Sequence, residues 1–208
     1  MKLDTRGLLI VISGPSGVGK GTVRKALFQR EGHDLEYSVS MTTRQPREGE
    51  VEGKEYYFVS REEFEKQVKE GNLLEYAEFV GNYYGTPYDK VREKLDQGSE
   101  MVLEIEVQGA MQVKRKIPDA VFIFIAPPSY KALKDRLLSR GTEDKKTVNE
   151  RLAKAHREVE LAGEYDYIVI NDEVDNAADR IMAIIRAEHA KCTRVLKQYY
   201  KLMEDTNE

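Results

Sequence analysis

The stretch LLIVISGPSGVGKGT, residues 8–22, decides how the rest of the chain is interpreted. It joins a short apolar run, typical of a buried strand, to a loop that contains four glycines, one proline and one lysine. Two interpretations fit such a loop. It is either a tight turn between a strand and a helix, or a cradle that wraps around the phosphates of a nucleotide.

The loop matches the pattern GxxxxGK through Gly14, Gly19 and Lys20, between an expected strand and an expected helix. Glycines tolerate positive φ, so successive backbone N–H groups can point at one anion, and the helix that follows adds its positive end. These features favour the phosphate cradle, in which Lys20 reaches the β- and γ-phosphates. Gly21 stands where Ser or Thr is usual, and Thr22 comes one place later. We therefore expect Mg²⁺ to be held mainly by phosphates and water, with no direct protein ligand.

Composition limits the classes of function. The chain has 208 residues, of which 40% are hydrophobic and 34% charged, as expected for one globular domain. A net charge of −4 argues against a nucleic-acid partner, and no apolar run approaches the roughly 20 residues of a membrane span. The first residues lack the pattern of a signal peptide, and the single cysteine excludes an intramolecular disulfide. We therefore expect a cytoplasmic protein.

Apolar strand-like runs alternate with helical patterns along most of the chain. This alternation predicts an α/β fold of the P-loop NTPase type, in which helices flank a parallel sheet. Residues 37–86 break the rhythm, because they are rich in Tyr, Val, Thr and Gly and predict short antiparallel strands around a helix at 61–70. The polar segment 140–152 is either a solvated linker or a mobile lid. The expected core strands are 8–13, 101–107, 120–126 and 166–171, and the expected helices are 20–30, 88–97, 108–117, 129–139, 145–163 and 175–203.

Two arginines in the β-rich insertion indicate a second phosphate site. Arg44 and Arg47 lie three residues apart, with Tyr56 nearby. Guanidinium groups suit bidentate binding of phosphate oxygens, although arginines in a charged loop are often ordinary surface residues paired with neighbouring glutamates. A second phosphate site beside a phosphate cradle predicts an acceptor that is itself a phosphate ester.

The motifs GPSGVGKGT, SVSMTTRQPREGEVEGKEYYF, EFVGNYYGT, EVQGA, IFIAPPS and SRGT…NERL occur in the order found in the guanylate kinase family. The chain resembles this family from about residue 7 to residue 187. The resemblance implies a cytoplasmic enzyme of purine nucleotide recycling that transfers the γ-phosphoryl of ATP to GMP, or to dGMP, with Mg²⁺. It also implies one domain with a P-loop core (1–36, 89–130 and 164–208), a GMP-binding lobe (37–88) and a helical lid (131–163). ATP and GMP are then the partners, and a homo-oligomer stays open.

The resemblance also assigns roles to individual residues. Guanine presents two parallel donors, N1–H and N2–H₂, which a carboxylate such as that of Glu75 can accept, whereas adenine offers an acceptor at N1. Glu50 is expected to orient an arginine, and the family often has aspartate where this chain has Glu104 and Glu106. The implied catalytic residues are Lys20, Arg44, Arg140 and Arg151. The implied ATP-binding residues are Gly14, Pro15, Ser16, Gly17, Val18, Gly19, Lys20, Gly21, Thr22, Arg136 and Asn171. The implied GMP-binding residues are Ser40, Arg44, Arg47, Glu50, Tyr56, Glu75, Tyr84, Thr86, Glu104 and Glu106.

Two other functions compete with this one. Domains similar to guanylate kinase also serve as inactive protein-interaction modules, which usually have a damaged ATP loop. A kinase for another nucleoside monophosphate would share the P-loop but not Glu75 in its LLEYAEF setting. The intact Lys20 and the arginine pairs favour the enzyme.

Overall fold

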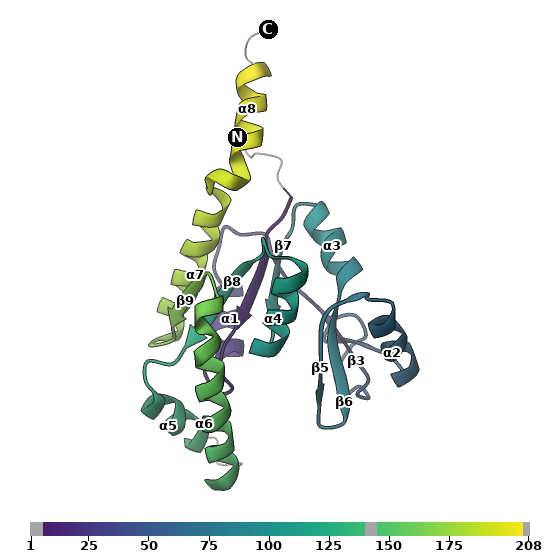
Figure 1. The fold of residues 1–208 in the computed structure, drawn as a ribbon, viewed down its shortest axis with the longest axis vertical. Coiled ribbons are helices and arrows are strands. Elements are labelled where there is room, and N and C mark those ends of the chain that lie inside the picture. Colours follow the sequence, from purple (N-terminus) through teal and green to yellow (C-terminus); the bar gives the residue numbers. More distant parts are fainter. Residues whose placement is uncertain (1–5, 140–144, 206–208) are drawn as a thin grey trace.

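A five-stranded parallel sheet forms the centre of the computed structural model, which describes residues 6–139 and 145–205 (Figure 1). The strand order is β2-β7-β1-β8-β9, and every neighbouring pair is parallel, so the carboxyl ends of the strands meet at one edge. This sheet confirms the predicted fold class. The strands are β1 (Leu9–Ser13), β2 (Leu35–Tyr37), β7 (Glu100–Glu104), β8 (Val121–Ala126) and β9 (Tyr167–Ile170).

Helices cover both faces of this sheet because both faces of β1 are apolar. Ile10 and Ile12 lie in one buried cluster with residues of α1 and α7, whereas Leu9 and Val11 lie in another with residues of α3 and α4. Successive side chains of a strand point to opposite faces, so one apolar run supplies both clusters. The helices are α1 (Lys20–Phe28), α3 (Tyr88–Asp96), α4 (Val107–Lys116) and α7 (Val174–His189).

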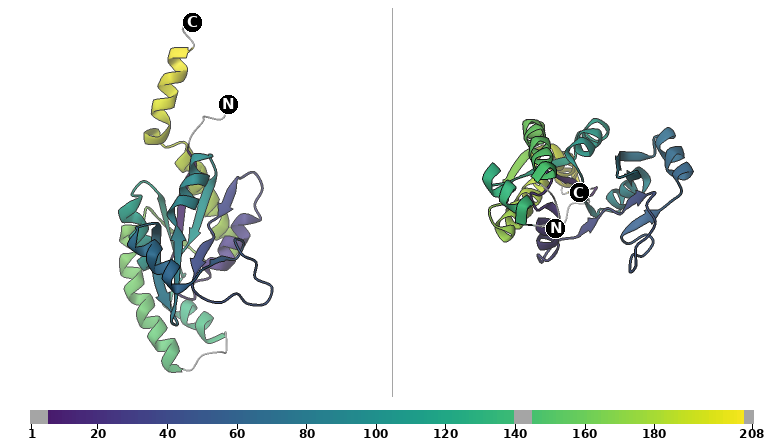
Figure 2. Two further views of the ribbon diagram at one scale, coloured as in Figure 1. Left: turned by 90° about the vertical axis from the view of Figure 1, so that its right-hand side faces the viewer. Right: turned by 90° about the horizontal axis from the view of Figure 1, so that it is seen from below.

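A second, four-stranded sheet forms a β lobe on one side of the core (Figures 1 and 2). Its order is β4-β3-β6-β5, and the ring of Phe64 on α2 stacks on Tyr83 with ring centroids 5.3 Å apart. Ser60 caps α2, because its side chain accepts the backbone N–H of Glu63 at the start of the helix. The elements are β3 (Ser40–Thr42), β4 (Tyr56–Phe58), α2 (Arg61–Lys69), β5 (Leu73–Phe79) and β6 (Asn82–Pro87).

The helices α5 and α6, which fall in the segment predicted to be a lid and are called the lid below, lie at one end of the molecule, and the last helix, α8, projects from the opposite end (Figures 1 and 2). The lid has its own small apolar cluster, made by Leu133, Leu137, Val148 and Ala155. No helix within residues 6–139 and 145–205 is long and apolar enough to cross a membrane. The elements are α5 (Tyr130–Ser139), α6 (Lys145–Glu160), the 3₁₀ helix η1 (Leu161–Glu164) and α8 (Cys192–Asp205).

Three details differ from the sequence prediction. Residues 35–37 form a short strand of the core sheet, so the chain enters the β lobe only after Tyr37. In the lobe β3 and β4 are parallel, not antiparallel, because residues 43–55 give a connection long enough for a crossover. The predicted helix 175–203 is two helices, α7 and α8, since the chain leaves the core after His189 and the side chains of Lys191 and Arg194 turn back onto Glu188 at 3.2 Å.

Candidate functional site

The loop between β1 and α1 has the geometry of an anion cradle. Gly19 caps α1 with φ +96°, a conformation that other residues rarely adopt. A Cβ atom at Gly14 would lie 2.2 Å from the backbone oxygen of Ile125, so only glycine fits there. The first turn of α1 has no acidic residue to compete for an anion at its positive end. The structure therefore confirms the strand, loop and helix that give this motif its meaning.

Lys20 lies folded over this loop. Its Nζ donates hydrogen bonds to the carbonyl oxygens of Gly14 at 2.7 Å and Pro15 at 3.3 Å. Burial lowers the pKa of Lys20, while the carboxylates of Glu104 and Glu106 oppose that shift. A partly desolvated cation beside a glycine-rich loop at the start of a helix is suited to bind a polyphosphate.

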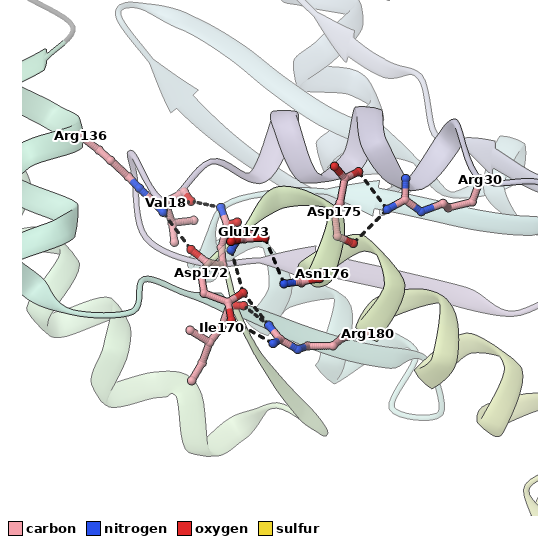
Figure 3. Close-up of polar contacts among 10 residues, drawn as sticks. Val18, Arg30, Arg136, Ile170, Asp172, Glu173, Asp175, Asn176 and Arg180 are labelled. Atoms are coloured by element: carbon pink, nitrogen blue, oxygen red, sulfur yellow. Dashed lines mark hydrogen bonds and ion pairs between the residues drawn. The ribbon is translucent and has the colours of Figure 1, made fainter.

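The far side of the loop is held by residues from the lid and from the end of β9 (Figure 3). Asn171 is buried and donates from Nδ2 to the backbone oxygen of Val18 at 2.7 Å. The guanidinium of Arg136 donates to the same oxygen at 3.1 Å and to the backbone oxygen of Asn171 at 2.9 Å. Both side chains were predicted to contact ATP, and the structure places them where they support the loop that would bind it.

A cavity of about 800 Å³, which we call the cleft cavity, lies where the β lobe, the core and the lid meet. Of the predicted GMP-binding residues, Ser40, Tyr56, Glu75, Tyr84, Glu104 and Glu106 line it. The remaining lining residues are Arg24, Tyr37, Lys54, Glu55, Ala77, Glu78, Phe79, Ile105, Gln108, Gly109 and Lys154.

Glu75 is a buried acidic residue in the wall of the cleft cavity, and its surroundings hold its carboxylate in place. Only 6% of the residue is exposed, and its Oε1 accepts the hydroxyl hydrogen of Thr86 at 2.7 Å. A Cβ atom at position 109 would lie 2.8 Å from Oε2, so Gly109 leaves the space that this carboxylate needs. Burial raises the pKa of Glu75 to about 6, although the Thr86 hydroxyl lowers it. The site therefore holds one desolvated acceptor group that is ionised at neutral pH.

The predicted orientation of an arginine by Glu50 is present in the β lobe. The two carboxylate oxygens of Glu50 accept from the guanidinium of Arg44 at 2.8 and 3.0 Å, and one of them also accepts the backbone N–H of Arg47 at 2.7 Å. Arg44 lowers the pKa of Glu50 through this hydrogen-bonded pair. The guanidinium carbon of Arg44 is 5.3 Å from the ring centroid of Tyr56, which lines the cleft cavity, whereas the side chain of Arg47 is exposed.

The lid brings one predicted arginine to the phosphate loop. Arg151 on α6 donates to the Ser16 hydroxyl at 2.7 Å. Arg140, the other predicted lid arginine, lies outside the described residues. Thr86 stands behind Glu75 as its hydrogen-bond donor and is itself buried.

Arg24, Tyr37 and Lys154 are among the residues that line the cleft cavity and that sequence reasoning missed. Arg24 donates to Glu104 at 2.7 Å and lies 4.2 Å above the ring of Tyr37. Lys154 on the lid donates to Glu106 at 2.7 Å. Helical spacing could have indicated both cations, because residues three or four positions apart share a face of a helix. Arg24 comes four residues after Lys20, and Lys154 comes three residues after Arg151. Tyr37 offered no comparable pattern.

The carboxylate of Glu104 lies beside Gly21, where a Mg²⁺ ion would accompany the nucleotide phosphates. A Cβ atom on Gly21 would lie 3.5 and 3.8 Å from the two carboxylate oxygens of Glu104. Oxygen ligands of this kind suit Mg²⁺, which usually keeps several waters and binds one or two carboxylates together with substrate phosphates. No cluster of three or more His, Cys, Asp or Glu side chains within the described ranges could hold a metal. The carboxylate of Glu104 therefore fits a Mg²⁺ ion that is bound mainly by nucleotide phosphates and water.

Comparison with known proteins places this geometry in one family. Residues 6–188 match the model of the family described as guanylate kinase. The chain is 58% identical over 206 residues to a guanylate kinase of Onion yellows phytoplasma, covering 99% of this chain and 97% of that one. It is 57% identical to a guanylate kinase of Enterococcus faecalis, covering 98% and 100%. The crystal structure of guanylate kinase from Anaplasma phagocytophilum superposes with a TM-score of 0.72 at 37% identity, covering 93% of this chain and 92% of that one.

Proposed function

The chain belongs to the guanylate kinase family, and on that premise we propose how its residues divide the work of the reaction. The protein transfers the γ-phosphoryl group of ATP to GMP and so produces ADP and GDP. The main support for the roles proposed below is the buried carboxylate of Glu75, which lies in a cavity beside the phosphate loop. We propose that dGMP is a second acceptor and that the enzyme works in the cytoplasm without a nucleic-acid partner.

Residues 14–22 bind the phosphates of ATP through backbone N–H groups, and Lys20 moves from its loop carbonyls to the β- and γ-phosphates. Arg136 and Asn171 hold the shape of that loop from behind. Glu104, beside the side-chain-free Gly21, would hold Mg²⁺ through water. The metal, when bound, neutralises charge on the phosphate oxygens.

GMP occupies the cleft cavity with its base toward Glu75. The carboxylate of Glu75, held by Thr86, accepts N1–H and N2–H₂ of guanine, and Ser40 faces the same base. Adenine would leave the buried carboxylate poorly paired, and each lost hydrogen bond of this kind costs about 1–3 kcal/mol. The GMP phosphate is bound by a set of arginines and tyrosines, namely Arg44, Arg47, Tyr56 and Tyr84.

Transfer takes place between these two sites when the lid is closed. An oxygen of the GMP phosphate attacks the γ-phosphorus in line, and this oxygen is already anionic, so no strong general base is needed. Arg44, Arg140 and Arg151, together with Lys20, stabilise the charge on the transferred group. Closure of the lid over the phosphate loop excludes water, which would otherwise hydrolyse ATP. No covalent enzyme intermediate forms.

Replacement of Lys20 tests the division into donor and acceptor sites. Lys20→Ala is expected to lower turnover by about 10²-fold or more, because the cation that stabilises the charge on the transferred group is lost, while GMP affinity changes little. Lys25→Ala is the matched control, since Lys25 is an exposed residue of the same helix. Equal losses of turnover and GMP affinity in Lys20→Ala would contradict the separate roles.

A further inference from the structure

One face of the lid helix α6 points at the junction of the phosphate loop and the cleft cavity. Arg151, Lys154 and Glu158 follow one another at intervals of three and four, so they share this face. Arg151 contacts Ser16 of the loop, whereas Lys154 contacts Glu106 at the start of α4. The buried Ala155 anchors the same part of the helix in the lid cluster.

Lys154 lies between the two substrate sites. It lines the cleft cavity together with Glu75 and Tyr84. Its positive charge also contributes to the lowered pKa of Lys20, so its ammonium group is close to the phosphate loop as well. Since the transferred phosphoryl group must pass from the loop to the cavity, Lys154 stands beside its path.

Two carboxylates hold the ammonium of Lys154 in this place. Nζ is 2.7 Å from Glu106 Oε2 and 3.6 Å from Glu158 Oε1. Glu158 is only 6% exposed, and its Oε2 is buried. Although partial burial lowers the pKa of Lys154, Glu106 and Glu158 raise it by more, so the side chain is charged at neutral pH. Glu106 and Glu158 therefore hold the charged ammonium group of Lys154 at the junction of the phosphate loop and the cleft cavity.

We propose that Lys154 is a catalytic cation of the lid that contacts the phosphoryl group during its transfer, and that Glu158 is the positioning residue that aims it. The proposal rests on the function proposed above. The transition state spreads negative charge over the equatorial oxygens of the transferred group, and a preorganised cation stabilises such charge. In this structure 42% of the Lys154 side chain is exposed, and closer approach of α6 to the cavity would exclude water from it.

The first test separates transfer from binding. Single-turnover transfer from saturating ATP to GMP is measured by rapid quench, and the affinities for GMP and ADP are measured separately by calorimetry. Lys154→Met is expected to slow transfer about 10²-fold, with each affinity within about twofold of wild type, and Lys154→Arg to recover part of the rate. Lys131→Met is the matched control, because Lys131 is an exposed lid lysine paired with Asp135.

The second test addresses Glu158 with a double-mutant cycle. Glu158→Gln is expected to slow transfer about tenfold, and the double variant with Lys154→Met is expected to be no slower than Lys154→Met alone, since Glu158 acts through Lys154. Fully additive losses would overturn the positioning role. A Lys154→Met enzyme that transfers within about threefold of wild type, or that loses GMP and ADP affinity as much as rate, would overturn the catalytic role. Failure of the wild-type protein to phosphorylate GMP would instead refute the proposed function, and the inference with it.

Discussion

Replacement of Glu75 by glutamine gives the sharpest prediction, because the carboxylate and its surroundings are well defined. Oε1 is held by Thr86, and the acid is buried against Gly109. Glutamine keeps an acceptor for Thr86 but turns a donor toward the two N–H groups of guanine. Two hydrogen bonds to a charged group, each worth about 1.5–3 kcal/mol, are lost. GMP affinity should therefore fall by roughly 10²- to 10⁴-fold at pH 8, while ADP affinity stays unchanged.

The pH dependence of this difference follows from the pKa of Glu75. In the free protein that pKa is about 6, raised from 4.5 by burial, and guanine binds the ionised form. Lowering the pH from 8 to 5 protonates Glu75 in about nine tenths of the free wild-type protein. The ratio between the GMP affinities of wild type and Glu75→Gln should therefore fall about tenfold. The phosphate of GMP also titrates near pH 6, but it does so equally for both proteins, so the ratio of their dissociation constants isolates Glu75.

Calorimetric titration of GMP between pH 5 and 8 measures this ratio. Glu78→Gln is the matched control, because Glu78 lies on the same strand and lines the same cavity but is exposed. Denaturation provides a check on folding. A raised pKa in the folded state means that Glu75 lowers stability above pH 6, so Glu75→Gln should be more stable at pH 8 by up to about 2 kcal/mol. A ratio that stays constant from pH 8 to 5, or a variant that binds GMP within threefold of wild type, would refute the reasoning.

Three further predictions follow from single contacts. Gly109→Ala places a Cβ atom 2.8 Å from Glu75 Oε2, so GMP affinity should fall at least about tenfold in calorimetry while ADP affinity is kept. Arg44→Met removes the guanidinium that Glu50 holds, so GMP should bind about 10²-fold more weakly, whereas the affinity for guanosine should not change. An equal loss of affinity for both ligands would exclude a contact between Arg44 and the phosphate. Arg61→Met is the control, because Arg61 forms an exposed ion pair with Glu65. Asn171→Ala removes the buried donor to the backbone oxygen of Val18, so the free energy of unfolding measured in urea should fall by about 1–3 kcal/mol. ADP should also bind more weakly. An unchanged ADP affinity would mean that the loop keeps its shape without this hydrogen bond.

The sequence predicted the core well because local signals and tertiary packing agree there. The local pattern predicts the observed structure in three successive segments: the apolar run 8–13, the glycines after it, and the helix that begins at Lys20. The prediction failed where the outcome depends on distant partners. The strand Leu35–Tyr37 is only three residues long and exists because β7 pairs with it, and the parallel direction of β4 depends on the course of a long loop.

The candidate site shows the same division. Glu75, Arg44 and Lys20 stand in long motifs, and the structure gives each a setting that suits its implied role. Lys154 and Arg24 carry no motif, and they reach the cleft cavity only because the lid and α1 pack beside it. The helical tail was predicted, but its separation into α7 and α8 was not, because the periodicity of a helix does not record where the core ends.

The most direct measurement is ADP release from ATP with Mg²⁺ across GMP, dGMP, AMP, UMP, CMP and dTMP. Rapid turnover with GMP, slower turnover with dGMP and little with the other four are expected, since only guanine presents two parallel donors to the buried carboxylate of Glu75. Comparable or faster turnover with AMP or a pyrimidine nucleotide would contradict recognition of the base by Glu75. No turnover with any acceptor, in a folded protein that still binds GMP, would contradict the enzyme itself.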